Sequence, residues 1–188
     1  MVSSKLVIGL AGMPGSGKSL VLNVAMENGY TIVVMGDVVR EETRKRGLEP
    51  TPPNVGQVML RLREEEGKGV IAKRCIPKIE NASSQKVFVD GLRSLDEVEE
   101  FRKHFPNFTL IAIHSSPETR FERLWKRQRS DDPIDRKTFH ERDGRELGVG
   151  LGDAIAMAEH MIINEGNIET VKRKIGENLR RAEAKWKK

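Results

Sequence analysis

The stretch GLAGMPGSGKSL, residues 9–20, decides how the rest of the chain is interpreted. It fits the spacing G-x-x-x-x-G-K-[ST], with Gly12, Gly17, Lys18 and Ser19 at the fixed positions. Glycines let backbone N–H groups turn inward around phosphate oxygens, and a helix beginning at Gly17 adds the positive end of its dipole. Lys18 is expected to reach the β- and γ-phosphates, and the Ser19 hydroxyl to ligate Mg²⁺. The loop residues predicted to bind nucleotide are Gly12, Met13, Pro14, Gly15, Ser16, Gly17, Lys18 and Ser19.

Strands and helices alternate along the chain. Residues 5–12 have the pattern of a buried strand, and the helix after the loop ends at Asn28-Gly29, a pair that tolerates left-handed backbone. Further strands are predicted at 30–37, 86–91, 108–116 and 160–166, and further helices at 38–46, 95–103, 117–129 and 153–159. This order predicts an α/β protein, a three-layer P-loop NTPase fold with a five-stranded parallel sheet. In such sheets ligands bind beyond the carboxyl ends of the strands.

The composition fits a single domain that binds an anion. The chain has 188 residues, of which 37% are hydrophobic and 32% charged, so it can bury a substantial core. The net charge of +5 suits an anionic ligand without identifying it. One cysteine, Cys75, leaves no internal disulfide and no cysteine-rich zinc site. The longest apolar run near the N-terminus, residues 6–13, is far shorter than the ~20 residues of a membrane span, so we expect no membrane attachment and a cytoplasmic location.

Much of the basic excess lies in the last segment, residues 171–188. Lysines and arginines there alternate with apolar residues spaced three or four apart. We favour a packed amphipathic helix with a solvated basic face over a nucleic-acid-binding surface, so we do not expect nucleic acid as a partner. The apolar positions are Ile168, Val171, Ile175, Leu179, Ala182 and Trp186.

Charged residues follow the predicted strands where a ligand would lie. Asp37 and Arg40 come after the second strand, and Asp90 and Arg93 after the third. Asp90 ends the apolar run VFVD, the place in such folds for an acidic residue that holds Mg²⁺. Its alternative role is that of a turn residue in the pair Asp-Gly. We favour the metal-binding role because of the phosphate loop upstream.

A second group of arginines lies in RLWKRQRSDDPIDRKTFHERDGREL, residues 123–147. This stretch is too polar for a core, and so many cations would repel one another unless they closed on a polyphosphate. Arginines placed in this way neutralise charge on a transferred phosphoryl group. The alternative is a surface helix in which they pair with acidic neighbours. The arginines are Arg123, Arg127, Arg129, Arg136, Arg142 and Arg145, and the acidic neighbours are Glu122, Asp131, Asp132, Glu141 and Asp143.

Taken in order, these motifs resemble the P-loop kinases of the nucleoside-monophosphate-kinase group, which includes adenylate kinase and dephospho-coenzyme A kinase. The resemblance covers nearly the full chain, and it is closer still to a functionally undefined archaeal family described as dephospho-coenzyme A kinase-like. MGDVVRE (35–41) is similar to the group's Gly-Asp-Leu-Leu-Arg, and VDGLRS (89–94) to its Asp-Gly-Phe-Pro-Arg. The residues that the resemblance assigns to acceptor binding are Asp37, Arg40, Asp90 and Arg93.

Three later segments extend the resemblance. ERLWKR (122–127) is similar to the stretch whose first arginine stacks on the ATP base and whose second contacts its phosphates, which implies these roles for Arg123 and Arg127. RSDD (129–132), followed by Arg142, resembles the lid of adenylate kinases. INEGNIE (163–169) resembles the segment near the adenine in dephospho-coenzyme A kinases and implicates Asn164 and Gly166. Departures are Leu92, where the group has proline, and a short lid without zinc-type cysteines.

The resemblance also implies a division of the chain. The core would comprise residues 1–47, 80–128 and 153–188, with a helical acceptor-binding insert at about 48–79 and a lid at about 129–152. The insert begins with EPTPPNVG (49–56), which contains no acceptor signature that can be interpreted. The identity of the acceptor is therefore left open.

We expect an enzyme, an ATP-dependent kinase that transfers the γ-phosphoryl group of Mg·ATP to a nucleoside monophosphate or a dephospho-coenzyme A-like acceptor. The alternative is a nucleotide-dependent binding module or ATPase switch that engages nucleic acid or a protein, but a switch has no need of Arg40 and Arg93. The oligomeric state is left open. The expected catalytic residues are Lys18, Arg127, Arg129 and Arg142. Arg123 is expected to bind ATP together with the loop, and Ser19 and Asp90 to hold Mg²⁺. The residues expected to bind the acceptor are Asp37, Arg40, Asp90 and Arg93.

Overall fold

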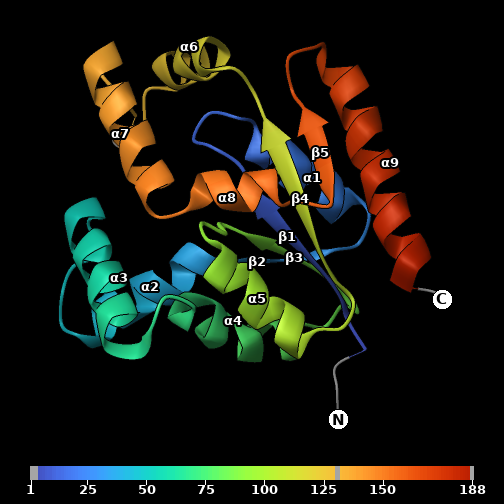
Figure 1. Ribbon diagram of the computed structural model, residues 1–188, viewed down its shortest axis with the longest axis horizontal. Coiled ribbons are helices and arrows are strands. Elements are labelled where there is room, and N and C mark those ends of the chain that lie inside the picture. Colours follow the sequence, from blue (N-terminus) through green and yellow to red (C-terminus); the bar gives the residue numbers. More distant parts are fainter. Residues whose placement is uncertain (1–3, 130–131, 187–188) are drawn as a thin grey trace.

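A computed structural model of the protein describes residues 4–129 and 132–186 (Figure 1). Five strands form one parallel sheet in the order β2-β3-β1-β4-β5. Because all strands run in the same direction, their carboxyl ends meet at one edge of the sheet. The prediction of an α/β fold with a five-stranded parallel sheet is confirmed. The strands are β1 (Leu6–Ala11), β2 (Thr31–Val34), β3 (Lys86–Asp90), β4 (Phe108–His114) and β5 (His160–Ile163).

The central strand β1 contributes to two separate cores because its successive side chains point to opposite faces of the sheet. Ile8 and Leu10 belong to a buried cluster completed by α1 and α9. Val7 and Ala11 belong to the other cluster, which α4, α5 and α8 complete. The molecule therefore has three layers, with the sheet between two layers of helices. The helices named here are α1 (Lys18–Glu27), α4 (Val70–Glu80), α5 (Leu95–His104), α8 (Leu151–Ala156) and α9 (Ile168–Trp186).

The C-terminal helix α9 has the expected amphipathic pattern. Val171, Ile175, Leu179 and Ala182 are buried in the cluster on the α1 face of the sheet. Ile168, at the start of the helix, differs from the expectation because it is 61% exposed. Among the helices of residues 4–129 and 132–186, none combines the length and the apolar content needed to cross a membrane.

The second strand is shorter than its sequence pattern predicts. The strand expected over 30–37 ends at Val34, and α2 (Met35–Lys45) begins at the next residue. Met35, Val38 and Val39 are buried at helical spacing, and Asp37 lies in the first turn, where the helix dipole favours negative charge. The prediction of strand over 35–37 was therefore wrong. Asp37 and Arg40 lie one turn apart on α2 instead of on a strand and a following helix.

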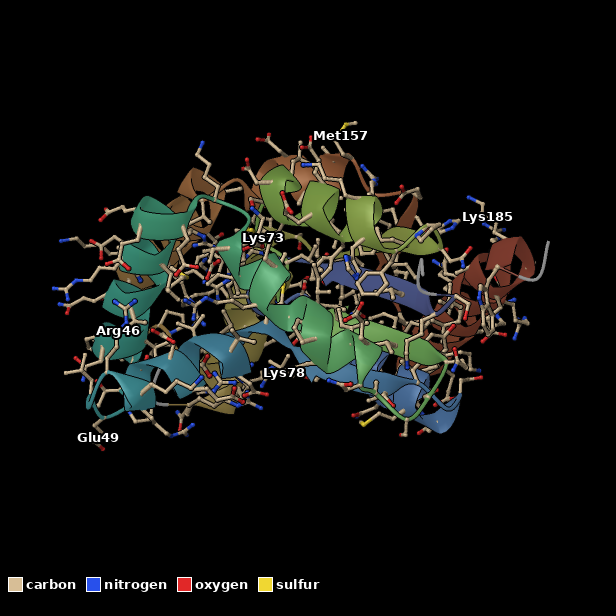
Figure 2. All side chains as sticks on the ribbon, turned by 90° about the horizontal axis from the view of Figure 1, so that it is seen from below. Arg46, Glu49, Lys73, Lys78, Met157 and Lys185 are labelled. Carbon is tan, nitrogen blue, oxygen red and sulfur yellow. The ribbon has the colours of Figure 1, made fainter. Side chains whose placement is uncertain are left out.

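Arginine–glutamate pairs hold α3 (Pro52–Glu66) against α2 and α4. Arg46, which follows α2, donates to Glu42 over 2.9 Å and to Glu65 of α3 over 3.2 Å. Arg74 of α4 donates to Glu42 over 2.9 Å and to Glu66 of α3 over 2.6 Å. Figure 2 shows Arg46 at the end of the molecule where α2 and α3 lie. These pairs fix the C-terminal end of α3 in relation to the other two helices.

Helices α6 (Pro117–Arg127) and α7 (Arg136–Gly148) follow β4. Figure 1 shows α6 beyond the carboxyl end of β4, and α7 and α3 on the same side of the molecule. The carboxyl edge of the sheet is thus surrounded by α6 and α7 on one side and by α2 and α3 on the other. Ser130 and Asp131 of the predicted RSDD lid segment lie outside the described residues.

Candidate active site

A cavity of about 520 Å³ lies at the carboxyl edge of the sheet. We call the part lined by the phosphate loop, Asp90, α6 and α7 the donor side, and the part lined by α2, α3 and residues 91–93 the acceptor side. Three lining residues with charged side chains were not predicted from the sequence: Arg63, Glu97 and Glu146. The predicted residues that line the cavity are Gly12, Pro14, Gly15, Gly17, Lys18, Ser19, Arg40, Asp90, Arg93, Arg123, Arg127, Arg129 and Arg142.

The phosphate loop connects β1 to α1 and depends on glycine at two positions. Gly15 and Gly17 have φ angles of 81° and 100°, in the left-handed region that side chains rarely adopt. A Cβ at Gly15 would stand 2.8 Å from the Arg120 carbonyl oxygen, and one at Gly17 would collide with the Asn164 amide. Met13 packs in the core and Ser16 is fully buried, so these two residues contribute their backbone to the loop.

Lys18 and Asp90 lie together at the base of the donor side. Lys18 Nζ donates to the Gly12 carbonyl over 2.7 Å and to the Met13 carbonyl over 3.3 Å. Burial lowers the pKa of Lys18 to about 8, although the negative charges of Asp90 and Glu146 favour the ammonium form. Burial raises the pKa of Asp90, because it disfavours the charged carboxylate, whereas the positive charge of Lys18 acts in the opposite direction. Asp90 Oδ1 is buried without a hydrogen-bond partner among the described residues.

Side chains from β4, α6 and the end of β5 support the loop from behind. Asn164 Nδ2 donates to the Ser16 carbonyl over 2.8 Å, and Ser115 Oγ donates to the Asn164 carbonyl over 2.8 Å. Arg123 donates to Ser115 Oγ over 2.8 Å and to the Asn164 carbonyl over 2.9 Å. The resemblance implies that Arg123 stacks on the ATP base. In the structure Arg123 lines the cavity and also binds Ser115 and Asn164, the residues that hold the loop.

Arg120 was not predicted, yet it connects the phosphate loop to α7. Its side chain is buried and donates to both carboxylate oxygens of Asp143, over 2.8 and 2.5 Å. The same guanidinium donates to the Pro14 carbonyl over 3.1 Å and lies over the ring of Phe139, 4.9 Å from its centroid. A signal was available, because Arg120, Arg123 and Arg127 recur at helical spacing and so share one face of α6.

The arginines of the predicted lid line the cavity and are also paired. Arg127 forms hydrogen bonds with Asp132, a residue whose side chain is only 2% exposed. Asp132 also accepts from the Arg129 backbone N–H over 2.9 Å and lies 3.6 Å from Arg142 Nη1. Arg127 is the main cause that holds the pKa of Asp132 below its usual range. These arginines therefore line the cavity and also pair with an acidic neighbour, as one interpretation expected, whereas their closure on a polyphosphate stays a prediction.

The acceptor side brings together Arg40 and Arg93 from separate elements. Arg40 pairs with Asp37 on α2 over 2.5 Å, and both side chains are about half exposed. Arg93 follows β3 and lies 3.4 Å from Glu146 of α7 and 3.9 Å from the Met59 sulfur of α3. Asp37, one of the predicted acceptor-binding residues, is thus the ion-pair partner of another.

Arg63 and Glu97 complete the acceptor side. Glu97 is 1% exposed; its carboxylate accepts from Arg63 Nη2 over 2.7 Å and from the Arg93 backbone N–H over 2.8 Å. Sequence reasoning missed both residues. Glu97 lies three residues after the N-cap Ser94, whose side chain accepts from the Glu97 N–H, so its sequence pattern is that of a helix start. Arg63 lies in a polar run at the end of α3 and carries no distinguishing sequence signal.

Comparisons with known proteins agree with this architecture. A family model described as AAA domain matches residues 11–138. The chain is 54% identical over 166 residues to a UPF0200 protein of Methanocaldococcus jannaschii, a match that covers 87% of this chain and 84% of that protein. It is 47% identical over 176 residues to a UPF0200 protein of Methanothermobacter thermautotrophicus, with coverage of 94% and 90%.

The fold itself is similar to that of a solved kinase. The shikimate kinase from Bacteroides thetaiotaomicron superimposes with a TM-score of 0.62 at 14% identity, over 93% of this chain and 98% of that one. At this level of identity the likeness concerns the fold alone. From its relatives and from the AAA domain that spans most of its length, the chain belongs to the UPF0200 family and to the AAA domain family.

Proposed function

We propose that this protein is an ATP-dependent phosphotransferase that transfers the γ-phosphoryl group of Mg·ATP to a small anionic acceptor. One observation carries the proposal: a single cavity is lined by a phosphate loop on one side and by Arg40 and Arg93 on the other. A protein that only senses a nucleotide has no use for this second set of cations. The two acceptor classes implied by sequence resemblance are nucleoside monophosphates and dephospho-coenzyme A-like molecules.

The donor side has the groups needed to hold a triphosphate. Loop N–H groups and the N-terminus of α1 favour phosphate oxygens, and Lys18 would exchange its two carbonyl partners for them. Ser19 and Asp90 would hold Mg²⁺, which suits the buried and unpartnered Asp90 Oδ1. Bound Mg²⁺ neutralises charge on the transferred group.

Transfer itself requires little covalent chemistry from the protein. An acceptor oxygen forms a bond to the γ-phosphorus while the bond from that phosphorus to the β–γ bridging oxygen breaks, and ADP leaves with the electron pair. A hydroxyl acceptor releases its proton to water, whereas the phosphate oxygen of a monophosphate acceptor is already deprotonated. Positioning and electrostatic stabilisation supply the catalysis, in which Lys18, Arg127, Arg129 and Arg142 neutralise the charge spread over the phosphoryl oxygens.

A coupled assay tests the proposal. The protein is incubated with Mg·ATP and, in turn, with each nucleoside monophosphate and with dephospho-coenzyme A, while ADP and phosphorylated product are quantified. We expect one acceptor class to raise ADP release with one product formed per ADP. Lys18→Met should abolish turnover, whereas Lys126→Met, which removes an exposed cation from α6, should leave it unchanged. ADP release that no acceptor accelerates would replace this proposal with a nucleotide-dependent binding module.

A further inference from the structure

We infer that the acceptor side is an oxyanion site in which Arg63, held by the buried Glu97, binds a phosphate monoester or carboxylate of the acceptor. The rest of the acceptor is recognised by apolar contact and not by hydrogen bonds to the edge of a nucleobase. This inference rests on the proposed function, since it names the class of molecule that enters the acceptor side of the same cavity.

Glu97 is a positioning residue whose two carboxylate oxygens are both occupied. Oε1 accepts from Arg63 Nη2 over 2.7 Å, and Oε2 accepts from the Arg93 backbone N–H over 2.8 Å. One buried carboxylate therefore fixes the guanidinium of Arg63 and the backbone from which the Arg93 side chain extends. Because its oxygens are already used, Glu97 orients the cations of this wall and is not itself free to bind a ligand.

Arg63 has bonding capacity that the described part of the chain does not use. Its side chain is 12% exposed and lines the cavity, and its Nη1 is buried without a hydrogen-bond partner among the described residues. Buried N–H donors nearly always have an acceptor, and a guanidinium presents several donors in a planar fork that matches an oxyanion. An acceptor oxyanion could bind the part of the guanidinium that faces the cavity, and it would supply a partner for the buried Nη1 once the groups that cover this atom move aside.

The helix that carries Arg63 is packed against the core. Val58 and Leu62 of α3 are buried in the core, and the next turn is tied by the pairs of Glu65 with Arg46 and of Glu66 with Arg74. A cation whose helix and whose carboxylate partner are both fixed loses little conformational freedom on binding a ligand. The arrangement is therefore that of a preformed binding residue.

Within the described ranges, the remaining walls of the acceptor side offer no neutral hydroxyl or amide side chain that could recognise a base. Among the described residues that line the cavity, Ser19 of the phosphate loop is the only neutral side chain with a hydroxyl or amide group. Base edges are distinguished by such donors and acceptors, whereas apolar walls distinguish only size and shape. The apolar side chains that line the acceptor side are Met35, Val39, Val55, Met59 and Leu92.

Arg40 and Arg93 add cations that an incoming oxyanion can share. The Arg40–Asp37 pair is 41% and 51% exposed, so it contributes little stability and is readily exchanged for a ligand oxygen. Arg93 lies 3.4 Å from Glu146 and is 40% exposed. Arg63 differs from both, because its pair with Glu97 is almost fully buried and leaves Nη1 unused.

Calorimetric titration tests the inference without relying on turnover. The full protein is saturated with Mg²⁺ and a non-hydrolysable ATP analogue, so that the phosphate loop is filled, and is then titrated with inorganic phosphate, ribose 5-phosphate, AMP, adenosine and shikimate. We expect ribose 5-phosphate and AMP to bind with affinities within a few fold of each other and adenosine not to bind. Shikimate distinguishes a site for carboxylate from one for phosphate. Binding of adenosine as tight as that of AMP would overturn the inference, and so would the failure of every oxyanion probe to bind.

Variants on one helix assign the effect to Arg63. Arg63→Met should weaken the oxyanion probes by roughly tenfold to a hundredfold, the range for a hydrogen bond to a charged group. Arg61→Met, on the exposed face of α3, should leave their affinities unchanged. Because Arg63→Met leaves a buried charge on Glu97, the double variant Arg63→Met/Glu97→Gln provides a second measurement. In this double variant, the amide oxygen introduced by Glu97→Gln can still accept from the Arg93 backbone N–H. A melting curve verifies that the variant is folded.

Oxyanion binding that persists in the folded double variant would overturn the role of Arg63. Failure of the proposed function looks different, because the wild-type protein would then not bind the ATP analogue or would not transfer phosphate to any acceptor. In that case, oxyanion binding that depends on Arg63 would still be measured with the phosphate loop empty.

Discussion

The donor and acceptor sides of the cavity are built from different parts of the chain. The phosphate loop of the donor side acts mostly through its backbone, and Asn164, Arg120 and Arg123 donate to its carbonyls. The acceptor side is mostly side chains, which include the partly unpartnered Arg63 and several apolar residues. Backbone can bind a feature that never varies, such as a chain of phosphates. Side chains can be exchanged one at a time, so they suit the part of the site that selects one substrate.

The largest effect should come from adding one methyl group to the donor side. Gly17→Ala places a Cβ against the Asn164 amide at a φ of 100°, so both backbone strain and a steric clash follow. We expect ATP binding to fall below detection and the free energy of unfolding to fall by more than about 3 kcal/mol. Calorimetry with the ATP analogue and chemical denaturation measure the two quantities.

A glycine on the acceptor-side helix α3 provides the matched control. A Cβ at Gly56 would meet no atom within 4 Å, and the residue lies inside a helix. Gly56→Ala should therefore leave ATP binding intact and raise the free energy of unfolding by up to about 1 kcal/mol. Equal losses of ATP binding in the two variants would contradict the view that backbone geometry defines the donor side.

A smaller effect should follow from breaking the link between the phosphate loop and α7. Asp143→Asn leaves the guanidinium of Arg120 buried without its counter-charge, and we expect a loss of about 2 kcal/mol in stability together with weaker ATP binding. Glu118→Gln removes the partner of Arg136 in an exposed pair that joins the same two helices. No change in melting temperature or ATP affinity is expected there. Similar losses in both variants would show that the contact between α6 and α7, and not the link to the loop, is what matters.

The smallest expected effect is a change of binding affinity with pH. It should differ between the two sides because the donor side uses a lysine and the acceptor side an arginine. Free Lys18 has a pKa of about 8, and bound phosphate would raise it because phosphate favours the ammonium form. Above pH 8, binding of the ATP analogue should therefore take up a proton, and its affinity should fall by at most about tenfold per pH unit. Oxyanion binding at Arg63 should hardly change over this range because a guanidinium stays charged.

Titrations at pH 7 and pH 9 in buffers with different ionisation enthalpies measure the proton uptake directly. Lys18→Met should remove both the uptake and the pH dependence from any binding of the analogue that remains. Uptake of equal size in that variant would assign the proton to another group. A strong pH dependence of oxyanion binding would contradict the role given to arginine.

Local sequence patterns were sufficient for the fold and for most of the donor side. The phosphate loop is continuous in the sequence, and each strand is a run of apolar residues, so neither depends on contacts that the sequence hides. The start of α2 was missed because the apolar run of β2 continues into Met35, and only Gly36 and Asp37 separate it from the buried Val38 and Val39. An apolar run of this kind fits a strand or a buried helix equally well.

Arg40 and Arg93 of the acceptor side were predicted because they follow strands, but the rest of its charged wall depends on contacts between distant residues. Arg63 and Glu97 are 34 positions apart, and each taken alone has an ordinary place at a helix end. Arg120 and Asp143 are 23 positions apart and meet only because α6 and α7 lie side by side. Such pairs require the tertiary structure, since no repeat or motif in the sequence connects their members.

Helix α7 touches both sides of the cavity. Asp143 binds the arginine that holds the Pro14 carbonyl of the loop, and Glu146, one turn later, lies beside Arg93. A substrate that moves α7 therefore changes the surroundings of the other substrate as well. Thermodynamic linkage requires the two influences to be equal, so ATP must change the affinity for the acceptor by the same factor as the acceptor changes the affinity for ATP. Any coupling of this kind between the two substrates would thus pass through one helix.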